Sequence, residues 1–200
     1  MPFPGRSPSP RLEPVEYLPE PPTQDSRPRS LAAKHALDRV GAVVALVAVA
    51  PLFLATALGL KLFASGPVLV RERRIDRDGR SFQLLGFQPV PILRRWSINQ
   101  IPQLVNVLRG QMSFVGPRPE RPEFVELFGA NLRRHDGPRR VRPGIAGWSQ
   151  LQGLSGRAPL AERVRWDDWY VENWSLWLDV KIVLMTVRDV CRGGHLASAD

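Results

Sequence analysis

Cysteine is almost absent from this sequence, because Cys191 is the only one among 200 residues. An intramolecular disulfide is therefore impossible, and the cysteine content gives no sign of an oxidising compartment. We expect Cys191 to be a buried thiol in the last helix, with a functional thiol as the alternative. The sequence also has no Gly-Lys-Ser/Thr phosphate loop, no cysteine and histidine cluster spaced for a metal, and no Gly-x-Ser-x-Gly turn. None of the enzyme classes that carry these motifs is indicated.

Acidic residues are scarce relative to basic ones. The chain has 19 Asp and Glu against 28 Lys and Arg, which gives a formal net charge of +9. So basic a protein usually meets an anion, which can be a nucleic acid, an acidic membrane surface or a phosphorylated substrate. No nucleic-acid-binding motif is present, and a long apolar segment argues against that partner. With 44% hydrophobic residues, the chain can bury one core, so we expect one domain with appendages.

The N-terminal segment lacks apolar runs. Residues 1–30 hold nine of the twenty prolines, and no stretch among them resembles the hydrophobic region of a cleavable signal peptide. Such a segment cannot bury enough surface to offset the entropy lost on ordering. We expect a disordered Pro-rich tail over residues 1–33 and a second tail over residues 193–200.

A long apolar segment covers residues 40–60 without any charged residue, and about 20 apolar residues suffice to span a bilayer. Pro51 sits at its midpoint, where it removes a backbone donor and kinks or breaks a helix. Arg39 and Lys61 flank the segment with positive charge, and positive ends favour the cytoplasm. We therefore predict a membrane segment over residues 34–66 that is broken at Pro51 and returns to the same face. A full span is the alternative.

The rest of the chain, residues 67–192, is predicted to form one cytoplasmic domain. Short extended runs on either side of Asp78-Gly79 indicate a β-hairpin. Two further stretches carry apolar residues at helical spacing, and they are residues 98–109 and 120–132. The aromatic stretch over residues 160–192 is expected to form a pair of helices that lies partly in the membrane interface. The expected fold class is α+β, mostly helical, with a membrane-associated N-terminal helix and a small β-hairpin.

The most informative stretch runs from Ser97 to Pro119 and reads SINQIPQLVNVLRGQMSFVGPRP. It resembles the signature of the bacterial sugar transferases, the membrane-bound phosphoglycosyl transferases that start polysaccharide assembly. Further parts of that family's pattern occur in the family's order, so the resemblance covers about residues 34–192. These parts are Leu37-Asp38-Arg39, Ala50-Pro51, Arg139 to Gln150 and Asp167 to Asp179.

The resemblance implies a function. Enzymes of this family move a sugar 1-phosphate from a nucleotide sugar, usually a UDP-sugar, to a polyprenyl phosphate such as undecaprenyl phosphate, as in exopolysaccharide biosynthesis. The family's Asp attacks the phosphate bonded to the sugar and forms a covalent intermediate, and the adjacent Glu helps to hold Mg²⁺. The implied partners are a nucleotide sugar, polyprenyl phosphate and anionic membrane lipid, with no nucleic acid. The implied location is the cytoplasmic face of the bacterial inner membrane.

Asn99 and Gln100 stand where the family carries its Asp-Glu pair. An amide is a poor nucleophile, and Gln100 can offer a metal an oxygen but no charge. No metal ligand is therefore assigned, and Mg²⁺ is expected only if the chain is active. Losing a covalent nucleophile typically costs on the order of 10⁴ to 10⁶ in rate. The alternative to a working transferase is a catalytically silent member that binds substrate or pairs with a homologous transferase.

Two arginines are predicted to hold substrate phosphates. Arg118 lies in a Gly-Pro-Arg-Pro turn and Arg142 in an Arg-Pro-Gly turn, and a guanidinium can grip phosphate oxygens with two parallel hydrogen bonds. Gly86 and Gln88 replace two basic residues of the family pattern near the expected site. The carboxylates that could stand in for the missing acid are Glu120, Glu123 and Asp168.

Overall fold

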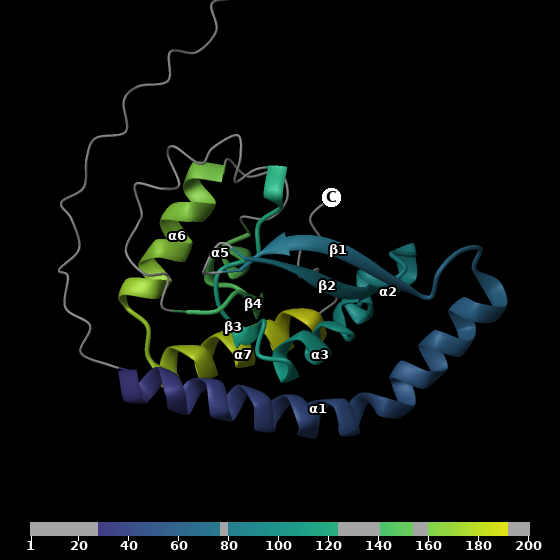
Figure 1. Cartoon of the computed structure of the whole chain (residues 1–200), viewed down its shortest axis with the longest axis horizontal. Helices are drawn as coiled ribbons and strands as arrows, with labels where there is room; N and C mark the ends of the chain where they lie inside the picture. The colour runs from purple at the N-terminus through teal and green to yellow at the C-terminus, as the bar shows by residue number, and fades with distance from the viewer. Residues whose placement is uncertain (1–27, 77–79, 124–140, 154–159, 192–200) are drawn as a thin grey trace, which may run out of the picture.

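A computed structural model of the chain describes residues 28–76, 80–123, 141–153 and 160–191. The elements in chain order are α1 (Pro28–Phe63), β1 (Leu69–Ile75), β2 (Ser81–Phe87), α2 (Pro91–Arg95), the 3-10 helix η1 (Ile98–Gln100), α3 (Gln103–Leu108), β3 (Ser113–Val115), β4 (Gly144–Ala146), α5 (Trp148–Leu151), α6 (Leu160–Glu172) and α7 (Leu176–Cys191). The predicted α+β, mostly helical class is confirmed. Figure 1 shows α1 passing along one side of the domain, with the β1–β2 hairpin on the opposite side.

Several predicted features fall wholly or partly outside the described residues. They are the N-terminal tail up to residue 27, the hairpin turn at residues 77–79, the helix over 120–132 from residue 124 onward, and the C-terminal tail over 193–200.

The helix α1 is continuous over 36 residues. It begins at Pro28, before the predicted start at residue 34, because proline is accepted in the first turn of a helix. Pro51 lies inside α1, and the helix bends in its C-terminal half (Figure 1). The predicted break is therefore a bend, since a long helix tolerates one lost hydrogen bond. The stretch Ser30–Phe63 is long and apolar enough to cross a membrane. Whether it spans or returns to the same face stays a prediction.

The predicted hairpin is present as the antiparallel pair β1–β2, which runs from Leu69↔Phe87 to Ile75↔Ser81. Successive side chains of a strand point to opposite faces. Arg71 and Arg73 are accordingly exposed, whereas Glu72 is half-buried and Arg74 is buried. The run of arginines is thus not one solvated face, and Glu72 and Arg74 point together toward the interior side.

The predicted helix over residues 98–109 is divided into η1 and α3. Pro102 separates the two because it has no N–H to donate to Ile98. Around it the amide N–H groups of Leu104 and Val105 bond to carbonyls three residues back, at 3.1 Å in both cases. The segment therefore begins as a 3-10 helix, and only its second half is an α-helix.

A short parallel pair, β3 with β4, joins two motifs that are distant in sequence. The backbones following β3 and entering β4 touch at Gly116 and Gly144. A Cβ on Gly116 would lie 2.1 Å from the carbonyl oxygen of Arg142, and a Cβ on Gly144 would lie 2.1 Å from the backbone nitrogen of Gly116. Only glycine fits at either position, so this contact fixes the turn that carries Arg118.

Asp179 of α7 is the centre of a buried polar cluster. Its carboxylate accepts hydrogen bonds from Lys34 Nζ at 2.6 Å, from the Tyr170 hydroxyl at 2.6 Å and from Trp174 Nε1 at 3.1 Å. Because Lys34 belongs to α1, the first helix is tied to the last two.

Asp38 extends this cluster to β3. Its carboxylate accepts hydrogen bonds from the Ser113 hydroxyl at 2.6 Å and from the backbone N–H of Phe114 at 3.3 Å, and it lies 3.9 Å from Lys34 Nζ. Lys34 also donates to the Val115 carbonyl at 3.1 Å. The N-terminal part of α1 therefore holds the strand that leads to Arg118.

Apolar side chains are exposed along both α1 and α7. On α7 they recur every three or four residues; they are Leu176, Trp177, Val180, Val183, Leu184 and Val187. On α1 they are Leu37, Val40, Val43, Val44, Val47, Leu52, Leu54, Leu58, Leu62 and Phe63. Apolar surface of this extent is typical of a membrane or protein contact. Cys191, at the end of α7, is exposed, so the prediction of a buried thiol is wrong.

Candidate active site

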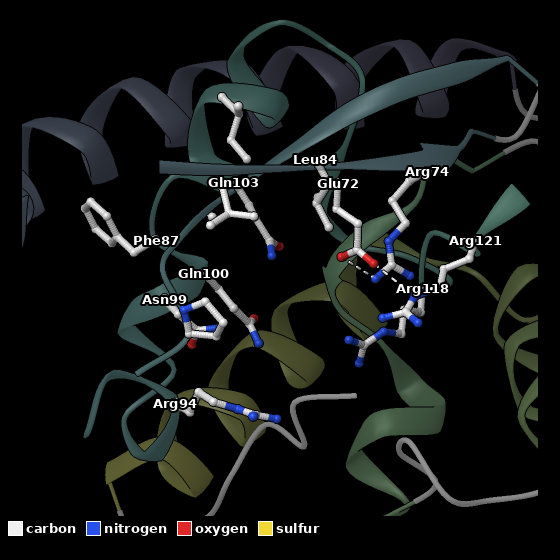
Figure 2. Close-up of a pocket in the computed structure, with 14 residues that line it drawn as sticks. Glu72, Arg74, Leu84, Phe87, Arg94, Asn99, Gln100, Gln103, Arg118 and Arg121 are labelled. Carbon is white, nitrogen blue, oxygen red and sulfur yellow. Dashed lines mark hydrogen bonds and ion pairs between the residues drawn. The ribbon is translucent and has the colours of Figure 1, made fainter. Parts of the chain in front are cut away.

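A cavity of about 310 Å³ opens between the hairpin, η1 and the turn after β3. Asn99 and Gln100 line it, as does Arg118, so the structure brings these predicted residues together (Figure 2). The lining residues are Val70, Glu72, Arg74, Leu84, Leu85, Gly86, Phe87, Pro89, Arg94, Asn99, Gln100, Gln103, Arg118 and Arg121. Among them are four arginines and one carboxylate, so the cavity is strongly cationic.

The segment of Asn99 and Gln100 is held close to strand β2. A Cβ on Gly86 would lie 3.2 Å from the carbonyl oxygen of Asn99, so a larger residue at position 86 would press on this segment. Ser97 starts the turn with φ at 55°, in the left-handed region that only glycine adopts easily. The N–H of Gln100 donates to the Ser97 carbonyl at 3.0 Å and is not available to a phosphate.

The side chain of Asn99 supplies no charge to the cavity. Its Oδ1 atom is buried and has no hydrogen-bond partner within the described part of the chain. A buried acceptor without a partner is costly. Asn99 thus brings a neutral amide to the cavity, and the oxygen of this amide is left unsatisfied by the described residues.

Arg118 and Arg74 form the cationic wall of the cavity (Figure 2). Burial, with repulsion from Arg74 and Arg163, lowers the pKa of Arg118 to about 10, so its guanidinium stays protonated at neutral pH. Arg74 is buried, and its Nη1 donates to the Pro119 carbonyl at 3.0 Å. Its position is therefore fixed by the turn that also carries Arg118.

Glu72 is a cavity-lining residue that the sequence analysis did not single out. Its Oε2 lies 2.8 Å from Arg74 Nη2, and its Oε1 lies 2.9 Å from Arg121 Nε. Burial alone would raise the pKa of Glu72, but the hydrogen bond and charge of Arg74 and the charge of Arg121 lower it below its usual value. Among the described lining residues, Glu72 is the one carboxylate, and it is ionised and paired on both oxygens. Residues two positions apart in a strand lie on the same face of it. The position of Glu72 two residues before Arg74 was therefore the sequence signal that could have indicated it.

Asp167 lies behind the turn that carries Arg118. Burial raises the pKa of Asp167 to about 6, although hydrogen bonds with the Ser149 side chain and the Arg118 backbone oppose the rise. Nearby, Glu120 pairs with Arg163 at 2.5 Å. Asp167 thus supports the backbone of Arg118 from outside the cavity.

The other predicted site residues lie elsewhere. The guanidinium groups of Arg142 and Arg39 lie against Gly110, at the end of α3, and Arg142 does not line the cavity. Its role in phosphate binding stays a prediction. The three substitute carboxylates also lie outside the cavity lining; they are Glu120, Glu123 and Asp168.

The lining residues do not suit Mg²⁺. This cation prefers several carboxylate or water oxygens, whereas the cavity offers Glu72, which two arginines already hold, and amide oxygens among four guanidinium groups. Within the described ranges, no group of three or more His, Cys, Asp or Glu side chains could hold a metal ion.

Comparison with known proteins identifies relatives. The family described as bacterial sugar transferase matches residues 29–91 and 90–193. The chain is 35% identical over 188 residues to the UDP-glucose:undecaprenyl-phosphate glucose-1-phosphate transferase of Xanthomonas campestris pv. campestris, covering 78% of this chain and 38% of that protein. It is 36% identical over 181 residues to a Caulobacter vibrioides protein of the same name, covering 77% of this chain and 68% of the relative.

A third relative matches over nearly its whole length. The exopolysaccharide production protein ExoY of Rhizobium meliloti is 32% identical over 219 residues, which cover 90% of this chain and 95% of that protein. The chain spans well under half of the Xanthomonas protein, so the shared part is the domain described above. The matched residues include the apolar helix α1, the arginine-lined cavity and the α6–α7 pair, and the chain belongs to the bacterial sugar transferase family.

Proposed function

We propose that this protein binds a nucleotide sugar through its diphosphate in the arginine-lined cavity and forms no covalent sugar-phosphate intermediate at position 99. The observation that carries the proposal is the composition of the cavity lining. Four guanidinium groups suit a diphosphate, whereas Asn99 and Gln100 provide no anionic nucleophile. Among the described lining residues Glu72 is the one carboxylate, and it is bound by Arg74 and Arg121. The described lining therefore has the means to hold phosphate, and it offers no unpaired carboxylate to attack it.

The proposed location is the cytoplasmic face of the bacterial inner membrane. The apolar helix α1 and the exposed apolar face of α7 support membrane attachment. The positive charges at Arg39 and Lys61 favour a cytoplasmic position for both ends of the apolar segment. At that face the cavity would be within reach of a polyprenyl phosphate, whose charged group lies among the lipid headgroups.

The test uses the full chain purified in detergent, with UDP-glucose as the nucleotide sugar. Equilibrium dialysis measures binding, and release of UMP in the presence of undecaprenyl phosphate and Mg²⁺ measures turnover. We expect binding without UMP release, and an unchanged intact mass after incubation with the sugar nucleotide. UMP release together with a mass increase of one sugar phosphate would overturn the silent assignment.

A matched variant tests whether the residues at positions 99 and 100 are the reason that UMP is not released. Asn99→Asp combined with Gln100→Glu restores the family's acids, so we expect it to gain weak UMP release at best. The reason is that Gly86 still stands where the family has a basic residue, and the family's Arg position holds Gln88. UMP release from the double variant at a rate no higher than from the parent would place the loss of activity elsewhere.

A working sugar-1-phosphate transferase is the second candidate. The observation that favours it is the similarity to proteins named as glucose-1-phosphate transferases, at 35% and 36% identity. If the protein is a working transferase, a carboxylate at a position other than 99 would have to attack the phosphate bonded to the sugar. Peptide mapping of any sugar-phosphate adduct would identify that carboxylate. An adduct on Glu72 would be the clearest support, because Glu72 is the lining carboxylate.

A further inference from the structure

The Glu72 carboxylate fills an anion position between two arginines. One of its oxygens lies 2.8 Å from Arg74 Nη2 and the other 2.9 Å from Arg121 Nε. A phosphate group presents two oxygens to guanidinium groups in the same way. Figure 2 shows the carboxylate pointing toward Arg74, with Arg118 and Arg121 close by.

The two partners of this contact differ in how firmly they are held. The Arg74 side chain is only 7% exposed, and it also donates to the Pro119 carbonyl, so its guanidinium is fixed. The side chains of Glu72 and Arg121 are about 40% exposed. A ligand phosphate can therefore replace the carboxylate without moving Arg74, because Glu72 has solvent to turn into.

A buried guanidinium also needs an anion when no ligand is bound. Leaving a buried charge without its partner is strongly destabilising. Glu72 meets this need for Arg74 in the ligand-free protein and, for the same reason, opposes any phosphate that approaches Arg74.

We propose that Glu72 is a specificity residue that competes with the ligand's phosphate for Arg74 and Arg121. This inference rests on the proposed function, since it assumes that a diphosphate binds in this cavity. The carboxylate lowers the affinity for every phosphate ligand and keeps weakly held anions out. A ligand that carries two linked phosphates overcomes it, because the second phosphate reaches other arginines of the lining while the first displaces Glu72.

Glu72→Gln tests the competition directly. Glutamine has nearly the same shape but no charge, so it cannot hold two arginines as an anion does. We expect UDP-glucose and inorganic pyrophosphate to bind about three- to tenfold more tightly to E72Q than to the parent, the range expected for two partly exposed ion pairs. We also expect E72Q to unfold at a lower temperature without ligand, and pyrophosphate to raise its unfolding temperature by more than it raises that of the parent.

Glu120→Gln is the matched control. Glu120 pairs with Arg163 close to the cavity but does not line it. E120Q removes the same charge and changes the same atoms, so a general electrostatic effect would tighten binding equally in both variants. We expect E120Q to bind pyrophosphate within about twofold of the parent, because the Glu120 carboxylate is held by Arg163 and occupies no anion position in the cavity.

The outcomes separate the two proposals. If neither the parent nor E72Q binds pyrophosphate or UDP-glucose, the proposed function fails and the inference fails with it. If the parent binds and E72Q gains nothing, or E120Q gains as much as E72Q, only the inference is overturned. Tighter binding confined to E72Q supports it, and so does binding by E72Q where the parent binds nothing. Should E72Q fold poorly, Glu72→Asp keeps the charge on a shorter arm, and a smaller gain in affinity is expected.

Discussion

Asp167 makes the stability of this domain depend on pH in a direction opposite to that of most surface carboxylates. Its folded pKa is raised from 3.8 to about 6, so between these values the folded chain keeps a proton that the unfolded chain has lost. Stability therefore falls as the pH rises through this range. The loss is complete about one pH unit above the folded pKa of about 6, where Asp167 is ionised in both states.

The size of the effect follows from the two pKa values. The difference between 3.8 and about 6 corresponds to about 3 kcal/mol of unfolding free energy. Asp167→Asn removes the ionisable group but keeps an oxygen that can accept from Ser149 and from the Arg118 backbone. We expect the unfolding free energy of D167N minus that of the parent to increase by about 2 kcal/mol between pH 4 and pH 7, which is less than the full difference because the unfolded carboxyl is still partly protonated at pH 4.

The assay is urea unfolding in detergent, followed by tryptophan fluorescence at several pH values. Taking the difference between variant and parent removes the contribution of other titrating groups. Asp189→Asn, at an exposed position of α7, controls for the loss of one charge. A difference for D167N that stays flat, or that falls as the pH rises, would refute the reasoning.

Four other predictions follow from the site and the fold. Arg118→Ala should weaken UDP-glucose binding in equilibrium dialysis by about 10- to 100-fold, the scale of charge-assisted hydrogen bonds, and Arg118→Lys should recover part of it. Arg142→Ala should weaken binding less, because its guanidinium does not line the cavity, and an equal loss would return Arg142 to the site. Cysteines placed before and after α1 should both resist a membrane-impermeant thiol reagent added to cells. Pro51→Leu should make one of these cysteines accessible to the reagent. Labelling of one end in the parent would establish a full span. Asp179→Ala should lower the free energy of unfolding, measured in urea, by about 3–5 kcal/mol, because it leaves the buried Lys34 charge without this partner. Adding Lys34→Met removes that charge and should recover part of the stability. If the double variant recovers none, the stability lost in Asp179→Ala has another cause.

Local patterns predicted most of the fold. Residues close in the sequence largely decide whether a short stretch forms a strand, a turn or a helix. The hairpin and the α6–α7 pair were therefore predicted correctly. The stretch 98–109 was predicted as one helix, yet Pro102 divides it, because the apolar periodicity continues through a residue that cannot donate a hydrogen bond.

The site was predicted in part. Asn99, Gln100 and Arg118 lie in the signature stretch and meet in one cavity. Glu72 was missed because it stands within a run of arginines, and its role depends on the pairing of β1 with β2 and on the position of Arg121. The place of the Arg142 guanidinium could not be predicted either, since it lies against Gly110, which is distant in the sequence.

The contact between Lys34 and Asp179 joins residues that are 145 positions apart in the chain. During synthesis Lys34 is made early and its carboxylate partner late, so at typical elongation rates the lysine waits about 10–30 s before Asp179 exists. Until then Asp38, which lies one helical turn further along α1 and 3.9 Å from Lys34 Nζ in the folded chain, is the carboxylate near the lysine. A chain interrupted before α7 would lack the carboxylate that accepts the 2.6 Å hydrogen bond from Lys34, so its first helix would have no such tie to the last one.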